Sequence, residues 1–104
     1  MIKLVCVNLQ NDFLENGAFP IKGFRDVVNK IVRLISATNE SRMNSSRVML
    51  VDSFHPENHF SFLCNGGKFP SHCIQNTYGQ NSCLAEYKDP DLRFYEKAIM
   101  GIDP

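Results

Sequence analysis

The chain has 104 residues, and its 11 Lys and Arg balance its 11 Asp and Glu, so the formal net charge is zero. Apolar residues make up 43% and charged residues 21%, a balance typical of a globular domain and not of a disordered chain. The neutral balance lacks the basic excess of a nucleic-acid-binding domain, so we expect no nucleic-acid partner. No apolar run approaches the ~18 residues that a membrane span needs, and the length suits one domain.

The first apolar stretch, Ile2 to Val7, is too short for the core of a signal peptide, and no small-residue cleavage site follows it. We therefore predict a cytoplasmic protein whose four cysteines are reduced thiols. These cysteines form no CxxC pair, which excludes a zinc ribbon or a thioredoxin motif by spacing.

Apolar periodicity predicts the first elements in chain order. Residues 2–8 (IKLVCVN) form a short apolar run rich in β-branched side chains, which indicates a strand buried on both faces. From Phe24 the apolar positions 27, 28, 31, 34 and 35 follow one helical face, with Asp26 near its start, and the polar stretch Thr38 to Ser46 is predicted as a loop. Arg47 to Val51 (RVMLV) is predicted as a second strand.

Two strands joined by an amphipathic helix predict a βαβ unit and hence a parallel sheet. Further along, Leu84 to Lys88 suits a short helix and Leu92 to Lys97 a third strand. Three strands with one long helix leave one sheet face without cover and an edge open. We therefore interpret the sequence as the first part of a larger α/β domain.

The segment Asp52 to Tyr78 holds prolines, glycines, aromatic residues and all three histidines. Such a loop at the carboxyl end of a strand is where α/β folds place their sites. If Pro56 opens a helical turn, His55 and His59 face the same side, and imidazoles together with a carboxylate such as Asp52 suit zinc, iron or manganese. The alternative is that the histidines are scattered surface or capping residues, and an HxxxH pair alone does not decide between the two.

Polar residues at the expected strand ends are further candidates. Asn8, Asn11 and Asp12 follow the first strand, and for Asp12 a turn cap is favoured over a general base. Lys97 lies at the end of the third predicted strand, and its alternative role is a solvated lysine. Cys73 follows His72 directly and is interpreted as a buried structural thiol, because neighbouring side chains diverge.

Four segments, VNLQNDFLENGAFPI, FHPENHFSF, FPSHCIQNTYGQ and YEKAIMGIDP, occur in this order. Together they resemble the nicotinamidase and pyrazinamidase branch of the isochorismatase-like hydrolases, over essentially the whole chain. The resemblance implies an α/β fold, a Rossmann-like parallel sheet with flanking helices. It also implies hydrolysis of a small amide such as nicotinamide to nicotinate and ammonia, a step of NAD salvage in pyridine nucleotide biosynthesis.

In that family a cysteine attacks the amide carbonyl, an aspartate takes the thiol proton, and a lysine supports the charge arrangement. A divalent metal (zinc, iron or manganese) held by one aspartate and three histidines orients the pyridine nitrogen. By this resemblance His55, His59 and His72 are metal ligands, Lys97 is the catalytic lysine and Phe13 binds the substrate.

The chain departs from the family pattern at three points. Asn8 occupies the position of the first-strand aspartate, and an amide cannot accept the thiol proton, a loss that typically costs ~10²–10⁴ in rate. Ser53 occupies the position of the metal-binding aspartate, and Asp52 is one residue away. The segment with the nucleophilic cysteine follows the lysine strand in the family. We therefore expect residues 1–104 to be a single partial domain that lacks this C-terminal segment.

Three hypotheses follow from these observations. The chain is a nicotinamidase-like amidohydrolase, a truncated or degenerate non-catalytic relative that depends on a partner, or a small metal-binding module built from His55, His59, His72 and Asp52. Because nucleophile and base are both missing, we expect no catalysis by the chain alone. We also expect marginal stability and exposed apolar surface, leading to self-association or to docking of a missing half-domain.

Overall fold

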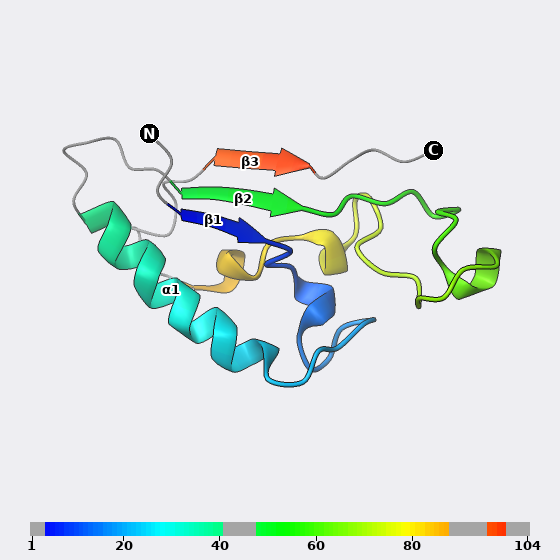
Figure 1. The fold of residues 1–104 in the computed structure, drawn as a ribbon, viewed down its shortest axis with the longest axis horizontal. Coiled ribbons are helices and arrows are strands. Elements are labelled where there is room, and N and C mark those ends of the chain that lie inside the picture. Colours follow the sequence, from blue (N-terminus) through cyan, green and yellow to red (C-terminus); the bar gives the residue numbers. More distant parts are fainter. Residues whose placement is uncertain (1–3, 41–47, 88–95, 100–104) are drawn as a thin grey trace.

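A computed structural model of the chain describes residues 4–40, 48–87 and 96–99, in which three strands, one α-helix and several single 3₁₀ turns follow one another (Figure 1). The strands and the helix are β1 (Leu4–Val7), α1 (Phe24–Glu40), β2 (Val48–Asp52) and β3 (Glu96–Ile99). The 3₁₀ turns are η1 (Asn11–Phe13), η3 (Leu63–Asn65), η4 (Tyr78–Gln80) and η5 (Cys83–Glu86).

The three strands form a parallel sheet in the order β1-β2-β3. Cys6 lies beside Leu50, and Leu50 lies beside Lys97, so each strand is in register with its neighbour. The chain crosses from β1 to β2 through α1, which confirms the predicted βαβ unit. All three strands end toward the same side of the molecule, and the segment between β2 and η4 extends beyond that end (Figure 1).

The helix differs from its prediction in length and in the width of its buried face. It continues to Glu40, through the first residues of the predicted loop. Polar side chains end an apolar stripe, but they do not stop backbone hydrogen bonding. Val28 and Ile35 are buried, whereas Val27 and Leu34 are exposed, so the apolar face that packs on the sheet is narrower than the sequence pattern suggests.

The strand bounds also shift slightly from the predicted ones. β2 extends one residue further than expected, because Asp52 pairs with Ile99. β3 ends at Ile99, so Lys97 lies inside this strand and not at its end, whereas positions 92–95 of the predicted strand lie outside the described residues. The expected short helix near Leu84 is the 3₁₀ turn η5, and position 88 lies outside the described residues.

The apolar core packs on one face of the sheet, whereas the side chains of β1 on the opposite face are exposed. Cys6 and Leu50 pack with α1 and η5 in a single apolar cluster. The alternate side chains of β1, Val5 and Val7, are 52% and 56% exposed. The expected uncovered apolar face is therefore present in the described part of the chain.

Two further expectations concern the environment of the chain. All four cysteines are free thiols, as predicted. No helix in the described ranges combines the length and the apolar character needed to cross a bilayer.

Candidate functional site

The histidine-bearing segment is tied together by main-chain hydrogen bonds between residues far apart in sequence. The His55 amide donates to the Cys73 carbonyl over 2.9 Å, and the Gln75 amide donates to the His55 carbonyl over 2.8 Å. These two bonds form an isolated parallel bridge between His55 and Ile74. The bridge brings His55 beside His72, although 17 positions separate them in the chain.

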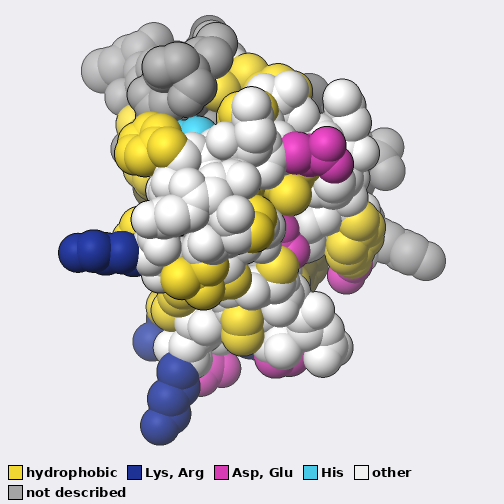
Figure 2. Space-filling model, turned by 90° about the vertical axis from the view of Figure 1, so that its right-hand side faces the viewer, with side chains coloured by type: hydrophobic (Ala, Val, Ile, Leu, Met, Phe, Trp, Pro, Cys, Tyr) yellow, Lys and Arg dark blue, Asp and Glu magenta, His cyan; other side chains and the backbone are white. Residues whose placement is uncertain are grey.

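All three histidines lie within one cluster. A turn closed by the His59 amide and the Pro56 carbonyl places the rings of His55 and His59 with centroids 4.3 Å apart, as the predicted turn after Pro56 requires. The rings of His55 and His72 are 5.2 Å apart. His59 and His72 are buried, and Figure 2, which views the molecule from this end, shows only a small area of histidine between apolar and polar side chains.

The imidazoles suit a metal ion in donor type and, for one pair, in spacing. Two imidazoles bound to one tetrahedral ion through bonds of about 2.0–2.1 Å have ring centroids about 5 Å apart, close to the His55–His72 separation of 5.2 Å. Nδ1 of His72 lies 2.8 Å from the Pro70 carbonyl, which only accepts, so this nitrogen carries the hydrogen and Nε2 offers the lone pair.

The donors do not, however, form a complete metal centre as they stand. The described ranges contain no group of three His, Cys, Asp or Glu side chains arranged to hold an ion. Nδ1 of His59 accepts the Ser61 amide over 3.3 Å and lies 2.7 Å from the Ser61 hydroxyl. Asp52, the expected fourth ligand, lines a cavity to which no histidine contributes. The donor types fit a metal, but the carboxylate does not join them.

Aromatic side chains surround the histidines. Phe13 is buried with its ring centroid 5.7 Å from that of His72, and Phe62 lies 5.5 Å from the same ring on another side. Phe19 packs edge-on against His72 at 5.0 Å. Such a setting is mostly apolar with a few polar nitrogens, which is typical of the lining of small-molecule sites.

The ends of β1 and β2 are joined by polar side chains. Asn8 has φ of 60°, a left-handed conformation that asparagine tolerates, and its Oδ1 accepts the Ser53 hydroxyl over 3.0 Å. Gln10 is buried, and its side chain bonds both main-chain groups of Ser53. Its Oε1 accepts a hydrogen bond from the Ser53 amide over 2.9 Å, and its Nε2 donates one to the Ser53 carbonyl over 2.8 Å. Gln10 was not among the predicted site residues, because its only signal in the sequence is a long polar side chain soon after a buried strand.

Asp12 has the predicted capping role. Its carboxylate oxygens accept the Ala18 amide over 3.0 Å and the Cys73 amide over 2.7 Å. The second bond holds Cys73 in a left-handed conformation with φ of 49°, an unusual backbone for this residue type. Asp12 therefore anchors the loop that carries His72 to the turn after β1, and both of its oxygens already have partners.

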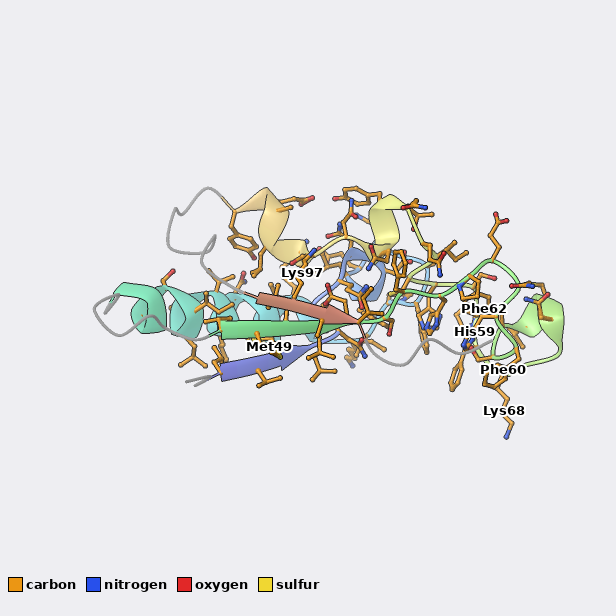
Figure 3. All side chains as sticks on the ribbon, turned by 90° about the horizontal axis from the view of Figure 1, so that it is seen from above. Met49, His59, Phe60, Phe62, Lys68 and Lys97 are labelled. Carbon is orange, nitrogen blue, oxygen red and sulfur yellow. The ribbon has the colours of Figure 1, made fainter. Side chains whose placement is uncertain are left out.

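Asp52 and Lys97 share a cavity of about 390 Å³ with Gln80 and three apolar residues, Phe54, Ala98 and Ile99. The Asp52 side chain is buried, and its Oδ1 has no hydrogen-bond partner among the described residues. Burial raises the pKa of this carboxyl above its usual value, and the charge of Lys97 opposes the rise. In Figure 3, Lys97 rises from β3 on the side of the sheet where η4 and η5 lie.

The buried thiols are poor nucleophiles. Burial raises the pKa of Cys73 to about 12 and that of Cys83 to about 11, and it raises the pKa of Cys6 as well. Because the thiolate is the reactive form, these three side chains are inert near neutral pH. Cys73 is fully buried, as expected of a structural thiol. Cys64 is exposed, with its sulfur 3.6 Å from the Ser71 hydroxyl.

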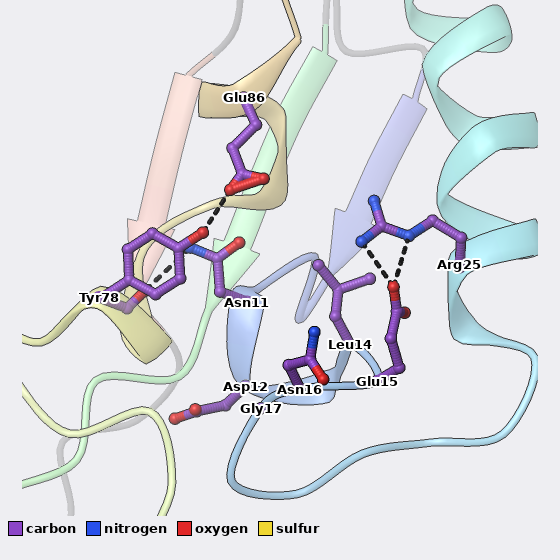
Figure 4. A pocket seen from close by; sticks show the side chains of 9 residues that line it. All are labelled: Asn11, Asp12, Leu14, Glu15, Asn16, Gly17, Arg25, Tyr78 and Glu86. Atoms are coloured by element: carbon purple, nitrogen blue, oxygen red, sulfur yellow. Dashed lines mark hydrogen bonds and ion pairs between the residues drawn. The ribbon is translucent and has the colours of Figure 1, made fainter.

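A second, smaller cavity of about 170 Å³ lies beside η1 and the start of α1 (Figure 4). Its charged lining residues have partners of their own: Arg25 pairs with Glu15 over 2.9 Å, and the Tyr78 hydroxyl donates to Glu86. Each of these two cavities is lined by one buried acceptor without a hydrogen-bond partner among the described residues: Oδ1 of Asn11 in the smaller and Oδ1 of Asp52 in the larger.

The chain matches no family model and no curated protein. It does match solved structures: the pyrazinamidase of Pyrococcus horikoshii in complex with zinc aligns with a TM-score of 0.80 at 28% identity, over 97% of this chain and 52% of that one. The PnC1 protein of L. infantum in complex with nicotinate aligns with a TM-score of 0.74 at 27% identity, over 96% of this chain and 47% of that one.

The yeast nicotinamidase Pnc1p bound to the inhibitor nicotinaldehyde shares the fold, with a TM-score of 0.75 at 21% identity, over 98% of this chain and 57% of that one. The chain thus spans about half the length of each of these structures. It is an α/β chain with a parallel three-stranded sheet, and nearly all of it matches about half of the isochorismatase-like nicotinamidase and pyrazinamidase fold.

Proposed function

We propose that this chain is the metal- and amide-binding portion of a nicotinamidase-like amidohydrolase, which converts nicotinamide to nicotinate and ammonia in NAD salvage. The observation that carries the proposal is the meeting of His55 and His72, with centroids 5.2 Å apart, beside the buried ring of Phe13. Similarity to a zinc-bound pyrazinamidase and to a nicotinate-bound PnC1 protein, at 28% and 27% identity, supports the substrate class.

In this proposal His55, His59 and His72 hold a divalent ion, zinc, iron or manganese, and Phe13 flanks the pyridine ring of the substrate. The ion supplies a Lewis-acid partner for the pyridine nitrogen, and the pocket residues keep the ring in place. His72 is prepared for this role, because the Pro70 carbonyl fixes its tautomer.

We further propose that residues 1–104 do not turn over an amide by themselves. Three of the four cysteines are buried with raised pKa values, so none of these supplies a thiolate. Asn8, at the position of the family's proton-accepting carboxylate, already accepts a hydrogen bond from Ser53 and carries no basic group. The fourth thiol, Cys64, is exposed, but the resemblance does not match it to the nucleophilic cysteine. In this proposal the nucleophilic thiol comes from a partner or from further polypeptide.

The test is metal content and amide binding of the purified chain. After loading with zinc, manganese or iron and dialysis, we expect about one ion per chain by elemental analysis. His72→Gln should lose that ion, whereas the neighbouring exposed substitution Asn58→Gln should keep it. A purified chain that binds neither metal nor nicotinamide would contradict the proposal. Ammonia release from nicotinamide by the chain alone would instead overturn the expected lack of turnover.

A second candidate function is a non-catalytic metal- or ligand-binding protein of the same fold. The observation that favours it is the pairing of Asn8 with Ser53, which puts two neutral side chains where the resemblance expects carboxylates. Stoichiometric metal and nicotinate binding with no ammonia release, even with an added thiol-bearing partner, supports this candidate over the first.

A further inference from the structure

We propose that Ser61 is a positioning residue of the histidine cluster, which holds His59 in the tautomer opposite to that of His72. His72 is ready to bind an ion, whereas His59 joins only after its ring hydrogen has moved and the Ser61 hydroxyl has reversed its hydrogen bond. The role of the ion rests on the proposed function, but the two tautomers of the metal-free chain rest on hydrogen bonds within the chain.

The main chain places the ring hydrogen of His59. The Ser61 amide donates to Nδ1 of His59 over 3.3 Å, and a main-chain amide N–H can only donate. Nδ1 therefore carries the lone pair in the neutral ring, and the hydrogen lies on Nε2. The Ser61 hydroxyl lies 2.7 Å from the same Nδ1 and is then its second donor.

His72 has the opposite arrangement. Its Nδ1 lies 2.8 Å from the Pro70 carbonyl, which can only accept, so Nδ1 carries the hydrogen and Nε2 carries the lone pair. A histidine that binds a metal through Nε2 needs this arrangement, in which Nδ1–H donates to a neighbouring acceptor. The two buried imidazoles therefore differ in their readiness to bind an ion.

The packing of the His59 ring resists an exchange of its two nitrogens by a ring flip. Its centroid lies 4.3 Å from that of His55, 4.6 Å from that of Phe60 and 5.5 Å from that of Phe62 (Figure 3). Only 4% of His59 is exposed, so a flip would displace closely packed neighbours. We therefore expect a change of tautomer, and not a ring flip, to bring the lone pair to Nε2.

Backbone contacts hold Ser61 in place beside this ring. Its carbonyl accepts the Phe69 amide over 2.9 Å. A Cβ on Gly67 would lie 2.1 Å from the same carbonyl oxygen, so only glycine lets the two backbone segments approach this closely. The Asn65 side chain donates to the His59 carbonyl over 3.0 Å. These contacts fix the direction of the Ser61 amide relative to the His59 ring.

The Ser61 hydroxyl suits both tautomers, because a hydroxyl can donate or accept. In the metal-free chain it donates to Nδ1 of His59. Before Nε2 can offer a lone pair to an ion, one hydrogen must leave Nε2 and one must join Nδ1 through solvent, so the ring stays neutral. The hydroxyl then accepts from Nδ1–H, whereas the amide bond, the longer of the two at 3.3 Å, is lost.

The experiment observes the ring nitrogens by NMR in a chain with isotope-labelled histidines, at a pH at which imidazoles are neutral. Long-range nitrogen–proton correlation distinguishes the protonated nitrogen of each ring from the bare one, and the single substitutions His59→Gln and His72→Gln assign the signals. In the metal-free chain we expect the hydrogen on Nε2 of His59 and on Nδ1 of His72. A metal-free His59 with its hydrogen on Nδ1 overturns the inference.

A zinc titration then tests the reversal of the hydrogen bond. We expect the hydrogen of His59 to move to Nδ1 on zinc binding, while His72 keeps its tautomer. Ser61→Ala leaves Nδ1–H without its acceptor and should weaken zinc binding about 10–100-fold, measured by competition with a chelating dye. Ser61→Thr keeps the hydroxyl and should restore the affinity. The matched control Ser71→Ala removes a hydroxyl that contacts Cys64 and should change neither the tautomers nor the affinity.

Two outcomes separate this inference from the proposed function. Equally tight zinc binding by the wild type and by a Ser61→Ala chain that circular dichroism shows to be folded overturns the role of Ser61 and leaves the histidine site standing. A chain that binds no zinc contradicts the proposed function and, with it, the reversal of the hydrogen bond. The metal-free spectrum decides the tautomer of His59 in either case.

Discussion

The Ser53 hydroxyl donates a hydrogen bond of 3.0 Å to the side-chain oxygen of Asn8, across the ends of β2 and β1. The resemblance expects a carboxylate at each of these two positions. Two carboxylates this close would repel each other unless a cation lay between them, whereas a hydroxyl and an amide satisfy each other without one. The pair of neutral residues therefore lets the apo chain close these strand ends without a bound ion.

Two substitutions of Asn8 should separate the stabilisation due to its side-chain hydrogen bond from the cost of its left-handed backbone conformation. Because Asn8 adopts a φ of 60°, we expect Asn8→Ala to destabilise the fold by about 1–3 kcal/mol through lost hydrogen bonding and left-handed strain. Asn8→Gly removes the same bond but tolerates that conformation, so it should cost less. Urea unfolding measures both, and equal costs for the two variants would contradict the strained-backbone explanation.

Gln10 should be the most costly polar side chain to remove at the site. It is 0% exposed and holds the Ser53 amide and carbonyl as well as the Gln80 carbonyl, the last over 2.7 Å. Gln10→Leu leaves buried main-chain groups without partners, and we expect a loss of about 2–4 kcal/mol in the free energy of unfolding. The control is Gln75→Leu, which removes one long bond of 3.3 Å and should cost about 1 kcal/mol or less. Similar losses for the two variants would contradict the central role of Gln10.

The buried cysteines should make the chain less stable at alkaline pH. The pKa of Cys73 rises from 9.0 to about 12, so the folded chain binds the thiol proton more tightly than the unfolded chain does. The contribution is complete below pH 9.0 and is lost as the pH rises toward about 12. We therefore expect the melting temperature to fall progressively above pH 9.0. Differential scanning fluorimetry over a pH series measures this fall.

The same burial predicts which thiols react in the folded chain. Under native conditions an aromatic disulfide reagent should label the exposed Cys64 quickly and the buried Cys73 and Cys83 only as the chain unfolds. Cys64→Ser should abolish the fast phase. Rapid native labelling of more than one thiol per chain would show that the core around Cys73 opens readily.

The open face of β1 should drive self-association of the purified chain. Val5 and Val7 are 52% and 56% exposed on a strand, and apolar strand surface of this kind associates readily. The double variant Val5→Thr/Val7→Thr keeps the β-branched shape and should weaken association by about tenfold in sedimentation velocity. Val27→Thr removes a comparably exposed apolar side chain from α1 and should leave association unchanged. A double variant that sediments like the wild type would exclude this face.

Local patterns were sufficient for the elements but not for their bounds. The apolar runs predicted the strands and the helix beginning at Phe24, because backbone period and side-chain burial are properties of neighbouring residues. The polar residues from Thr38 did not end the helix, which continues to Glu40. Lys97 lies inside β3, because strand pairing with β2 sets the end of that strand.

The sequence predicted which types of residue make up the candidate site, but not all of their contacts. The clustering of three histidines after β2, the capping role of Asp12 and the burial of Cys73 all follow from residue type and position. The partnership of Asp52 with Lys97 could not be predicted, because it depends on which strand ends lie beside each other and on which side of the sheet each residue faces. Gln10 could not be identified either, since its partners Ser53 and Gln80 are 43 and 70 positions away.

By itself the sequence determined an α/β chain with a parallel sheet and a histidine-rich loop at its carboxyl edge, because hydrophobic period and turn chemistry act over a few residues. Only the tertiary structure decided which side chains meet. Main-chain bonds between His55 and the segment around Cys73 bring His72 to the cluster. Strand register places Lys97 beside Leu50 and Asp52 beside Ile99, so that Asp52 and Lys97 line one cavity. Such contacts join residues distant in the chain, so they follow from the packing of whole elements and not from any local spacing.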